Sequence, residues 1–87
     1  RELGIFTRLF EADSFEAGVD NIVESIASGP TVALGEAKRL LDRGPESTFE
    51  SALDREAAAQ GVAFTTADHR EGATAFMEQR EPEFEGR

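Results

Sequence analysis

Apolar residues recur along most of this chain at the spacing of an α-helix. The first stripe starts after Asp13 and falls at relative positions 0, 4, 7, 8 and 11, on one side of a helix. Its members are Phe15, Val19, Ile22, Val23 and Ile26. Asp13 or Ser14 is placed to cap this helix, and Gly29 to end it. The pattern therefore predicts an amphipathic helix that ends at Gly29.

A second helix is expected after Pro30, because proline suits the first turn of a helix. Cationic residues gather toward its C-terminal end, where they complement the helix dipole, and Gly44-Pro45 breaks it. Its apolar side carries Ala33, Ala37, Leu40 and Leu41.

A capping box predicts a third helix, because Ser47 is followed three residues later by Glu50. Gly61 weakens the last turn of this helix. The residues expected to face one way are Phe49, Ala52, Leu53, Ala57, Gln60 and Phe64.

A fourth helix is expected after Thr65 or Thr66, either of which is a suitable cap. Arg80 lies near its end, Glu81-Pro82 stops it, and a short tail follows. Its apolar side is Ala73, Phe76 and Met77. Gly72 inside this helix costs about 1 kcal/mol against alanine, so we expect a close neighbour there, and Phe84 is a candidate anchor for the tail.

The first residues follow another pattern. Arg1 to Gly4 is typical of a helix end closed by glycine, and residues 5–10 have the β-branched and aromatic content of a short strand. This strand has no partner in the sequence, so the chain has the pattern of a piece of something larger. We expect an all-α fold of about four short helices after an orphan short strand. Residues 1–12 form the remnant of another unit, and residues 13–87 form the helical module.

Length and composition limit the range of possible functions. A chain of 87 residues forms one small domain, which buries roughly 60–65% of its unfolded surface and is marginally stable alone. It has no cysteine, so disulfides and thiolate metal sites are excluded. Oligomerisation, or docking onto another part of the same polypeptide, is the remaining support. No apolar run reaches the ~20 residues of a membrane span, and no signal peptide is present, so we expect the cytoplasm.

The net charge of -9 argues against nucleic acid and anionic membranes as partners. Lys38 is the only lysine among the nine basic residues. An acidic, lysine-poor and still foldable chain is typical of proteins from a salt-rich cytoplasm, where screening removes self-repulsion. An ordinary acidic domain is the alternative.

Two clusters of ionisable residues are candidate sites. Asp68, His69 and Glu71 are one and three positions apart, a spacing that converges less well than an i, i+4 pair, so no metal site is expected and His69 is expected at the surface. Acidic residues at i, i+4 spacing on the first helix more simply make a solvated face than a pair of catalytic acids. These residues are Glu16, Asp20 and Glu24.

The segment from Thr65 to Arg87 resembles the ending of the enoyl-CoA hydratase/isomerase (crotonase) family. That ending has a hydroxyl cap and Asp, then Glu-Gly, then Ala-Phe, and then a basic residue, Pro, Phe and Gly. Residues 37–41 are similar to the family's Ala-Lys-basic-apolar helix, and residues 3–10 to its Leu-Gly turn and strand. The order and spacing of these matches hold across the whole chain.

The resemblance implies the C-terminal helical module of the crotonase fold, which packs into trimers or stacked trimers. It also implies an enzyme that hydrates or isomerises an acyl-CoA thioester in fatty-acid metabolism. The family's catalytic groups lie upstream of the matched region, so no catalytic residue is transferred and the chain alone is predicted to be inactive. We expect no cofactor bound by this chain, with the coenzyme A thioester as substrate of the parent enzyme.

The resemblance implies that the last helix approaches the CoA end of the active site, as it does in members of the family. Phe76 corresponds to the family's Ala-Phe aromatic and Arg80 to a basic position, so both are candidates for CoA or acyl contact. Gln79 and Glu81 replace positions that are commonly basic, which weakens a phosphate-binding role. Lys38 matches the family's helix lysine. A solvated or salt-bridged structural role is expected for it at least as much as a functional one. The alternative function is a stand-alone acidic helical domain that mediates protein interaction without catalysis.

Overall fold

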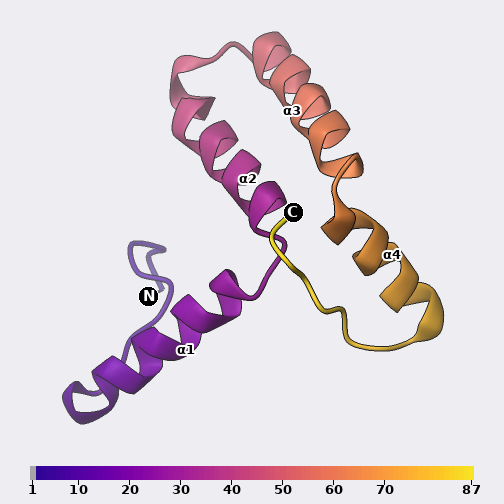
Figure 1. Ribbon diagram of the computed structural model, residues 1–87. Helices are drawn as coiled ribbons and strands as arrows, with labels where there is room; N and C mark the ends of the chain where they lie inside the picture. Colours follow the sequence, from indigo (N-terminus) through magenta and orange to yellow (C-terminus); the bar gives the residue numbers. More distant parts are fainter. Residues whose placement is uncertain (1) are drawn as a thin grey trace.

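The computed structural model describes residues 2–87, which form four α-helices, two short 3-10 helices and no strand (Figure 1). Arg1, with which the predicted helix end begins, lies outside the described residues. The elements in chain order are η1 (Ala12–Ser14), α1 (Phe15–Ala27), α2 (Thr31–Arg43), η2 (Gly44–Glu46), α3 (Phe49–Phe64) and α4 (Ala67–Glu78).

The predicted strand at residues 5–10 is wrong, because this segment is irregular. A strand is held by hydrogen bonds to a neighbouring strand, and the described part of the chain offers none. The segment is held by Phe10 instead. The Phe10 ring lies against Gly18 of α1 and meets the ring of Phe15 edge-on, with 6.3 Å between ring centroids.

The helix caps differ in detail from the sequence prediction. The capping box at Ser47 is shifted by one residue, because the Thr48 hydroxyl accepts the Ser51 N–H at 3.1 Å. The Ser47 hydroxyl donates to the Arg43 carbonyl at 2.7 Å and so closes the end of α2. At α1, Ser14 is the cap residue, but its hydroxyl donates backward to the Glu11 carbonyl and no side chain caps the helix.

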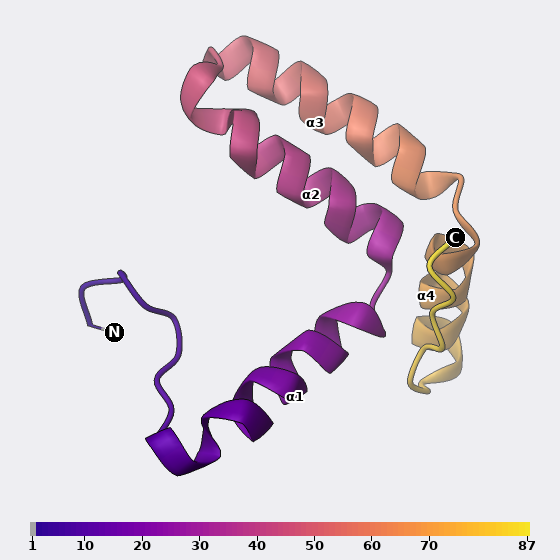
Figure 2. The same ribbon diagram turned by 60° about the vertical axis from the view of Figure 1, so that its left-hand side comes forward.

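The fourth helix ends earlier than predicted. It stops at Glu78, because Gln79 adopts a left-handed conformation with φ 57°. The Arg80 N–H then donates to the Ala75 carbonyl at 3.0 Å, which closes the helix end as in a left-handed cap. This turn reverses the chain, and the tail runs back along α4 (Figures 1 and 2).

Helices α2 and α3 lie side by side and antiparallel, whereas α1 extends away from them (Figures 1 and 2). The radius of gyration is 16.2 Å, against about 12 Å for a compact domain of this length. The accessible surface is 7428 Å², against about 5000 Å² for a compact monomer of this mass. The molecule is therefore open, with little core of its own.

Only two described residues are buried, Ala75 at 1% and Asp68 at 3% exposure, and both belong to α4. Large apolar side chains lie at the surface in every helix, among them Phe15, Ile26, Leu41, Phe49 and Phe76. Within the described residues, no helix is both long and apolar enough to cross a membrane. The apolar stripes of the sequence are thus present as helix faces that are only partly covered within the molecule.

Candidate functional site

A cluster of polar contacts joins α4 to the tail; we call the contacts of Asp68 and Glu71 with residues 80–87 the tail clasp. Asp68 accepts the Glu85 N–H at 2.7 Å with one carboxylate oxygen and the Gly86 N–H at 2.8 Å with the other. Its own N–H donates to the Arg87 carbonyl at 2.8 Å. The Asp68 carboxylate is buried, and backbone donors satisfy both of its oxygens.

The second half of the tail clasp is built on Glu71. Two guanidinium nitrogens of Arg80 donate to the two oxygens of the Glu71 carboxylate at 2.6 and 3.0 Å, and the Glu83 N–H donates to it at 2.8 Å. The hydrogen bond from Arg80, and then that from Glu83, lower the pKa of Glu71 to about 2. Hydrogen bonds to Glu71 and then to Glu78 raise the pKa of Arg80. Arg80 is thus a structural anchor of the tail.

Apolar contacts complete the attachment of the tail. The Phe84 ring lies over Gly72, as the sequence led us to expect for this glycine and this anchor. A small cavity of about 150 Å³ lies at the junction of α2, α3, α4 and the tail. Its lining includes Pro30, Ala33, Ala63, Thr66, Asp68, His69 and Phe84.

The two predicted ligand-contact residues have different surroundings. The Arg80 guanidinium lies on the tail side of α4, paired with Glu71, whereas Phe76 is 83% exposed. Met77 beside it is 81% exposed. The predicted apolar side of α4 therefore faces solvent, because the tail covers the side that carries Gly72 and Ala75. Phe76 is the more accessible of the two candidates.

The remaining candidates occupy the surface. Lys38 forms an exposed i, i+4 ion pair with Asp42 at 3.4 Å. His69 stacks at a tilt on the Phe64 ring, with 4.7 Å between ring centroids. Residues 2–87 bring together no group of three His, Asp or Glu side chains that could hold a metal ion.

The sequence does not reveal the tail clasp. In the sequence, Asp68 and Glu71 stand with His69 as candidate metal ligands, but their partners are backbone N–H groups and an arginine of the tail. The spacing of three residues, which is poor for a metal, places both carboxylates along one side of α4, where an extended tail can run past them.

No family model matches the chain. It is 29% identical over 86 residues to a 1,2-epoxyphenylacetyl-CoA isomerase of Escherichia coli, covering 99% of this chain and 33% of that protein. It is 30% identical to a short-chain-enoyl-CoA hydratase of Clostridium acetobutylicum, covering 93% of this chain and 31% of that protein. A crystal structure of an enoyl-CoA hydratase from Geobacillus kaustophilus matches with a TM-score of 0.90 at 27% identity, covering 99% of this chain and 33% of that one.

These matches define the fold as the C-terminal helical module of crotonase-fold proteins, which confirms the all-helical fold class expected from the sequence. The chain belongs to the enoyl-CoA hydratase/isomerase family and corresponds to a C-terminal segment of such an enzyme. It spans about a third of the length of the curated relatives it matches.

Proposed function

We propose that this segment serves subunit assembly and completes the CoA and acyl site of an enzyme that hydrates or isomerises acyl-CoA thioesters. The observation that carries the proposal is the contrast between ordered helices and absent core. Every helix has an apolar stripe, yet the described residues bury only Ala75 and Asp68. Apolar faces of this extent are the mark of surfaces that another polypeptide covers.

The first helix illustrates this surface. Phe15, Val23 and Ile26 lie on one side of α1 and are each more than half exposed. The main helix contact of α1 is with the short η1 turn, and α1 extends away from α2, α3 and α4 (Figure 1). Burying the exposed half of each of these three side chains stabilises an assembly by roughly 1–1.5 kcal/mol, about half of the value for a fully exposed side chain. We propose a homo-oligomer: a trimer or stacked trimers in the parent enzyme, and for this chain alone either that assembly or an altered, swapped one.

Phe76 is the proposed contact for an acyl chain or an adenine ring of the coenzyme A thioester. Its ring projects from α4 into solvent, so it is available to a ligand without rearrangement of the tail clasp. Arg80 is the proposed neighbour on the same helix end. Its charge is shared between Glu71 and Glu78, and the more exposed pair with Glu78 is the one a phosphate would replace. The chain itself is proposed to supply no catalytic group and to bind no further cofactor.

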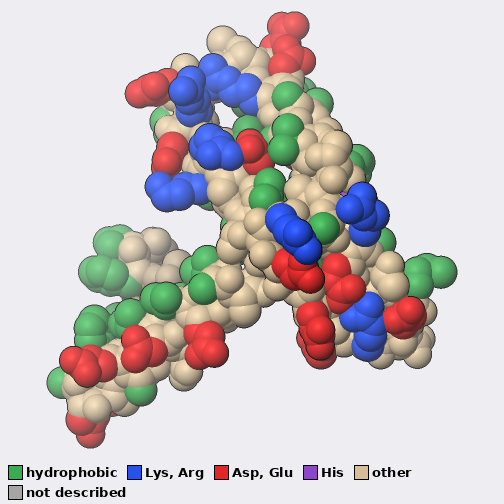
Figure 3. Space-filling model, in the orientation of Figure 1, with side chains coloured by type: hydrophobic (Ala, Val, Ile, Leu, Met, Phe, Trp, Pro, Cys, Tyr) green, Lys and Arg blue, Asp and Glu red, His purple; other side chains and the backbone are tan. Residues whose placement is uncertain are grey.

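We propose a salt-rich cytoplasm as the setting of this chain, because acidic residues are in excess. A cytoplasm rich in salt suits a chain with 18 acidic and 9 basic residues, because screening weakens repulsion between exposed carboxylates. Figure 3 shows acidic side chains along α1, and acidic and basic side chains side by side around α2 and around α4 with the tail.

The test compares assembly and ligand binding in the purified chain. We expect an oligomer by size-exclusion chromatography with light scattering, weak binding of crotonyl-CoA, and no turnover of it. Phe76→Ala should weaken binding several-fold, and Met77→Ala, an equally exposed neighbour, should not. A monomer at all concentrations would contradict the assembly role, and turnover would contradict the absence of catalytic groups.

A stand-alone interaction domain is the second candidate, and the tail clasp favours it because the tail closes on the chain's own helix. It predicts the same oligomer without acyl-CoA binding. Equal crotonyl-CoA affinity of the Phe76→Ala and Met77→Ala variants, with assembly intact, would favour this second function.

A further inference from the structure

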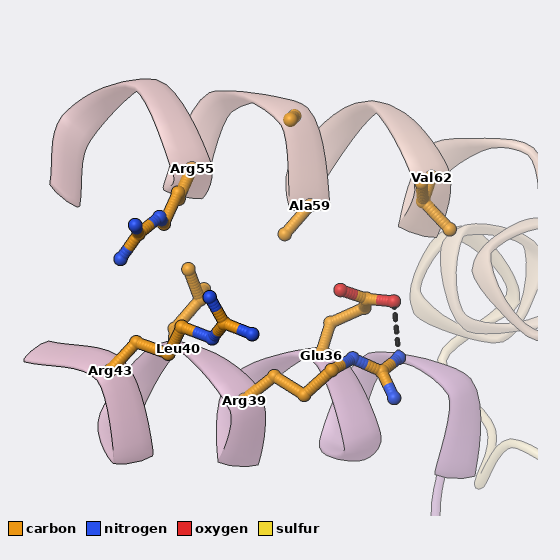
Figure 4. A pocket seen from close by; sticks show the side chains of 8 residues that line it. Glu36, Arg39, Leu40, Arg43, Arg55, Ala59 and Val62 are labelled. Atoms are coloured by element: carbon orange, nitrogen blue, oxygen red, sulfur yellow. Dashed lines mark hydrogen bonds and ion pairs between the residues drawn. The ribbon is translucent and has the colours of Figure 1, made fainter. Parts of the chain in front are cut away.

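A groove of about 290 Å³ lies between α2 and α3, away from the tail clasp and from Phe76. Its apolar floor includes Leu40, Ala59 and Val62. Figure 4 shows Arg55 projecting from α3 and Arg39 and Arg43 from α2 around this floor. The groove thus combines an apolar floor with a rim of three guanidinium groups and one carboxylate, that of Glu36.

Two of these guanidinium groups lack an acidic partner. Arg39 pairs with Glu36, and this ion pair is drawn in Figure 4. Within residues 2–87, Arg43 and Arg55 have no carboxylate within 4.0 Å, and the hydrogen-bond partner of Arg55 is the neutral hydroxyl of Ser47. Acidic residues outnumber basic ones by 18 to 9, so carboxylates are abundant on this molecule. Because Arg43 and Arg55 line the same groove, these two cations together offer a place for an external anion.

We infer that this groove binds an amphipathic oxyanion, that is, a carboxylate or phosphate group carried on a short apolar chain. A guanidinium presents planar paired donors that match both kinds of oxyanion. The floor accepts the apolar part of the ligand, as in small-molecule sites, where apolar lining is combined with a few polar groups. The volume lies at the small end of the range for such sites, which suits a short chain rather than a whole coenzyme.

The charge of the whole molecule argues that such binding is local. A net charge of -9 repels anions at long range, so a bound anion has to be held by nearby donors. Rim residues and floor are separate from the residues of the proposed acyl-CoA contact. The groove can therefore fail as a site while that proposal stands, and the reverse also holds.

The experiment titrates the full chain with octyl phosphate and with octanoate below their micelle concentrations, followed by NMR of the arginine Nε–H signals. Inorganic phosphate and octanol serve as the two half-ligands. We expect both amphiphiles to shift the signals of Arg43 and Arg55, and each half-ligand to bind at least several-fold more weakly. Comparison of the two amphiphiles then identifies which oxyanion the rim prefers.

The deciding variant is Arg43→Gln/Arg55→Gln, which should bind octyl phosphate on the order of tenfold more weakly, as expected for two exposed charge pairs. The matched control is Arg8→Gln/Arg70→Gln, which removes two exposed arginines that also lack a carboxylate partner within residues 2–87. It should retain affinity within twofold. Circular dichroism verifies equal helicity of both variants.

Three outcomes would overturn the inference. Equal weakening in both double variants would assign binding to net charge, equal binding of octanol would assign it to exposed apolar surface, and equal binding of inorganic phosphate would indicate an adventitious ion only. If Arg43→Gln/Arg55→Gln loses helicity, Arg43→Lys/Arg55→Lys replaces it. That variant keeps both charges but loses the paired donors, and unchanged affinity would contradict the proposed geometry.

Discussion

The ring of Phe84 lies 3.6 Å from the position that a β-carbon on Gly72 would occupy. This distance is ordinary van der Waals contact, so the tail rests on α4 at the one position of its covered side that has no side chain. The tail clasp fixes the backbone on either side of that contact, through Glu71 before it and Asp68 after it. Apolar and polar contacts thus alternate along the tail.

Gly72→Ala should stabilise the molecule. Alanine fits beside the Phe84 ring and removes the helix penalty of glycine, a gain of up to about 1 kcal/mol. Urea denaturation followed by circular dichroism measures the change. Gly61→Ala in α3, where the added β-carbon meets open space, is the control with the same expected gain. Destabilisation by Gly72→Ala alone would show that the Phe84 contact is tighter than the structure indicates.

Gly18→Ala, unlike Gly72→Ala, should disrupt the packing around it. A β-carbon at this position would overlap the Phe10 ring, which therefore has to leave its place on α1. The expected result is loss of the edge-on contact between Phe10 and Phe15, seen as lost nuclear Overhauser effects between the two rings. Persistence of those signals in the variant would contradict the packing of residues 5–10 described above.

Asp68→Asn should release the tail. An asparagine has one acceptor oxygen where the carboxylate has two, so the N–H of Glu85 or of Gly86 loses its partner. Loss of a buried charge-assisted hydrogen bond costs about 1–3 kcal/mol. Hydrogen exchange at these two amides should accelerate, and that of α2 should not. Asp54→Asn, a change of the same charge on the exposed side of α3, should leave both rates unchanged.

The tail should also loosen in acid. The pKa of Glu71 is lowered from 4.5 to about 2, so the folded state favours the carboxylate form. Its contribution is fully present above pH 4.5, declines as the pH falls from there toward 2, and is lost below 2. Exchange of the Glu83 amide across this range measures the effect. Glu71→Gln should remove the dependence, and an unchanged profile in that variant would assign it to another group.

The helices were predictable because their signals are local. The stripe from Phe15 to Ile26, the break at Gly44-Pro45 and the cap of α4 are each local features, and the structure contains all three. Of the two threonines predicted for that cap, the structure uses Thr66. The cap of α3 was misplaced by one residue because Ser47 and Thr48 are both good cap residues. Which of two adjacent hydroxyls caps a helix depends on the turn before it, here η2.

The tail clasp was less predictable because its partners are far apart in the sequence. Glu71 and Arg80 are nine positions apart, and their meeting requires the left-handed turn at Gln79, a residue that seldom adopts it. The prediction of a strand at residues 5–10 is wrong for the opposite reason. Its local composition was suitable, but a strand also needs a neighbour, which composition does not reveal.

Salt should increase the helicity of the chain. Raising the ionic strength from about 0.01 to about 1 M shortens the Debye length from about 30 to about 3 Å, which removes repulsion among the excess carboxylates. The i, i+4 acids of α1 should respond most, because like charges at this spacing destabilise a helix. A variant with these acids neutralised should be more helical at low salt and respond less to added salt; the changes are Glu16→Gln, Asp20→Asn and Glu24→Gln. Equal helicity of the unmodified chain at both salt concentrations, by circular dichroism, would contradict adaptation of this acidic surface to salt.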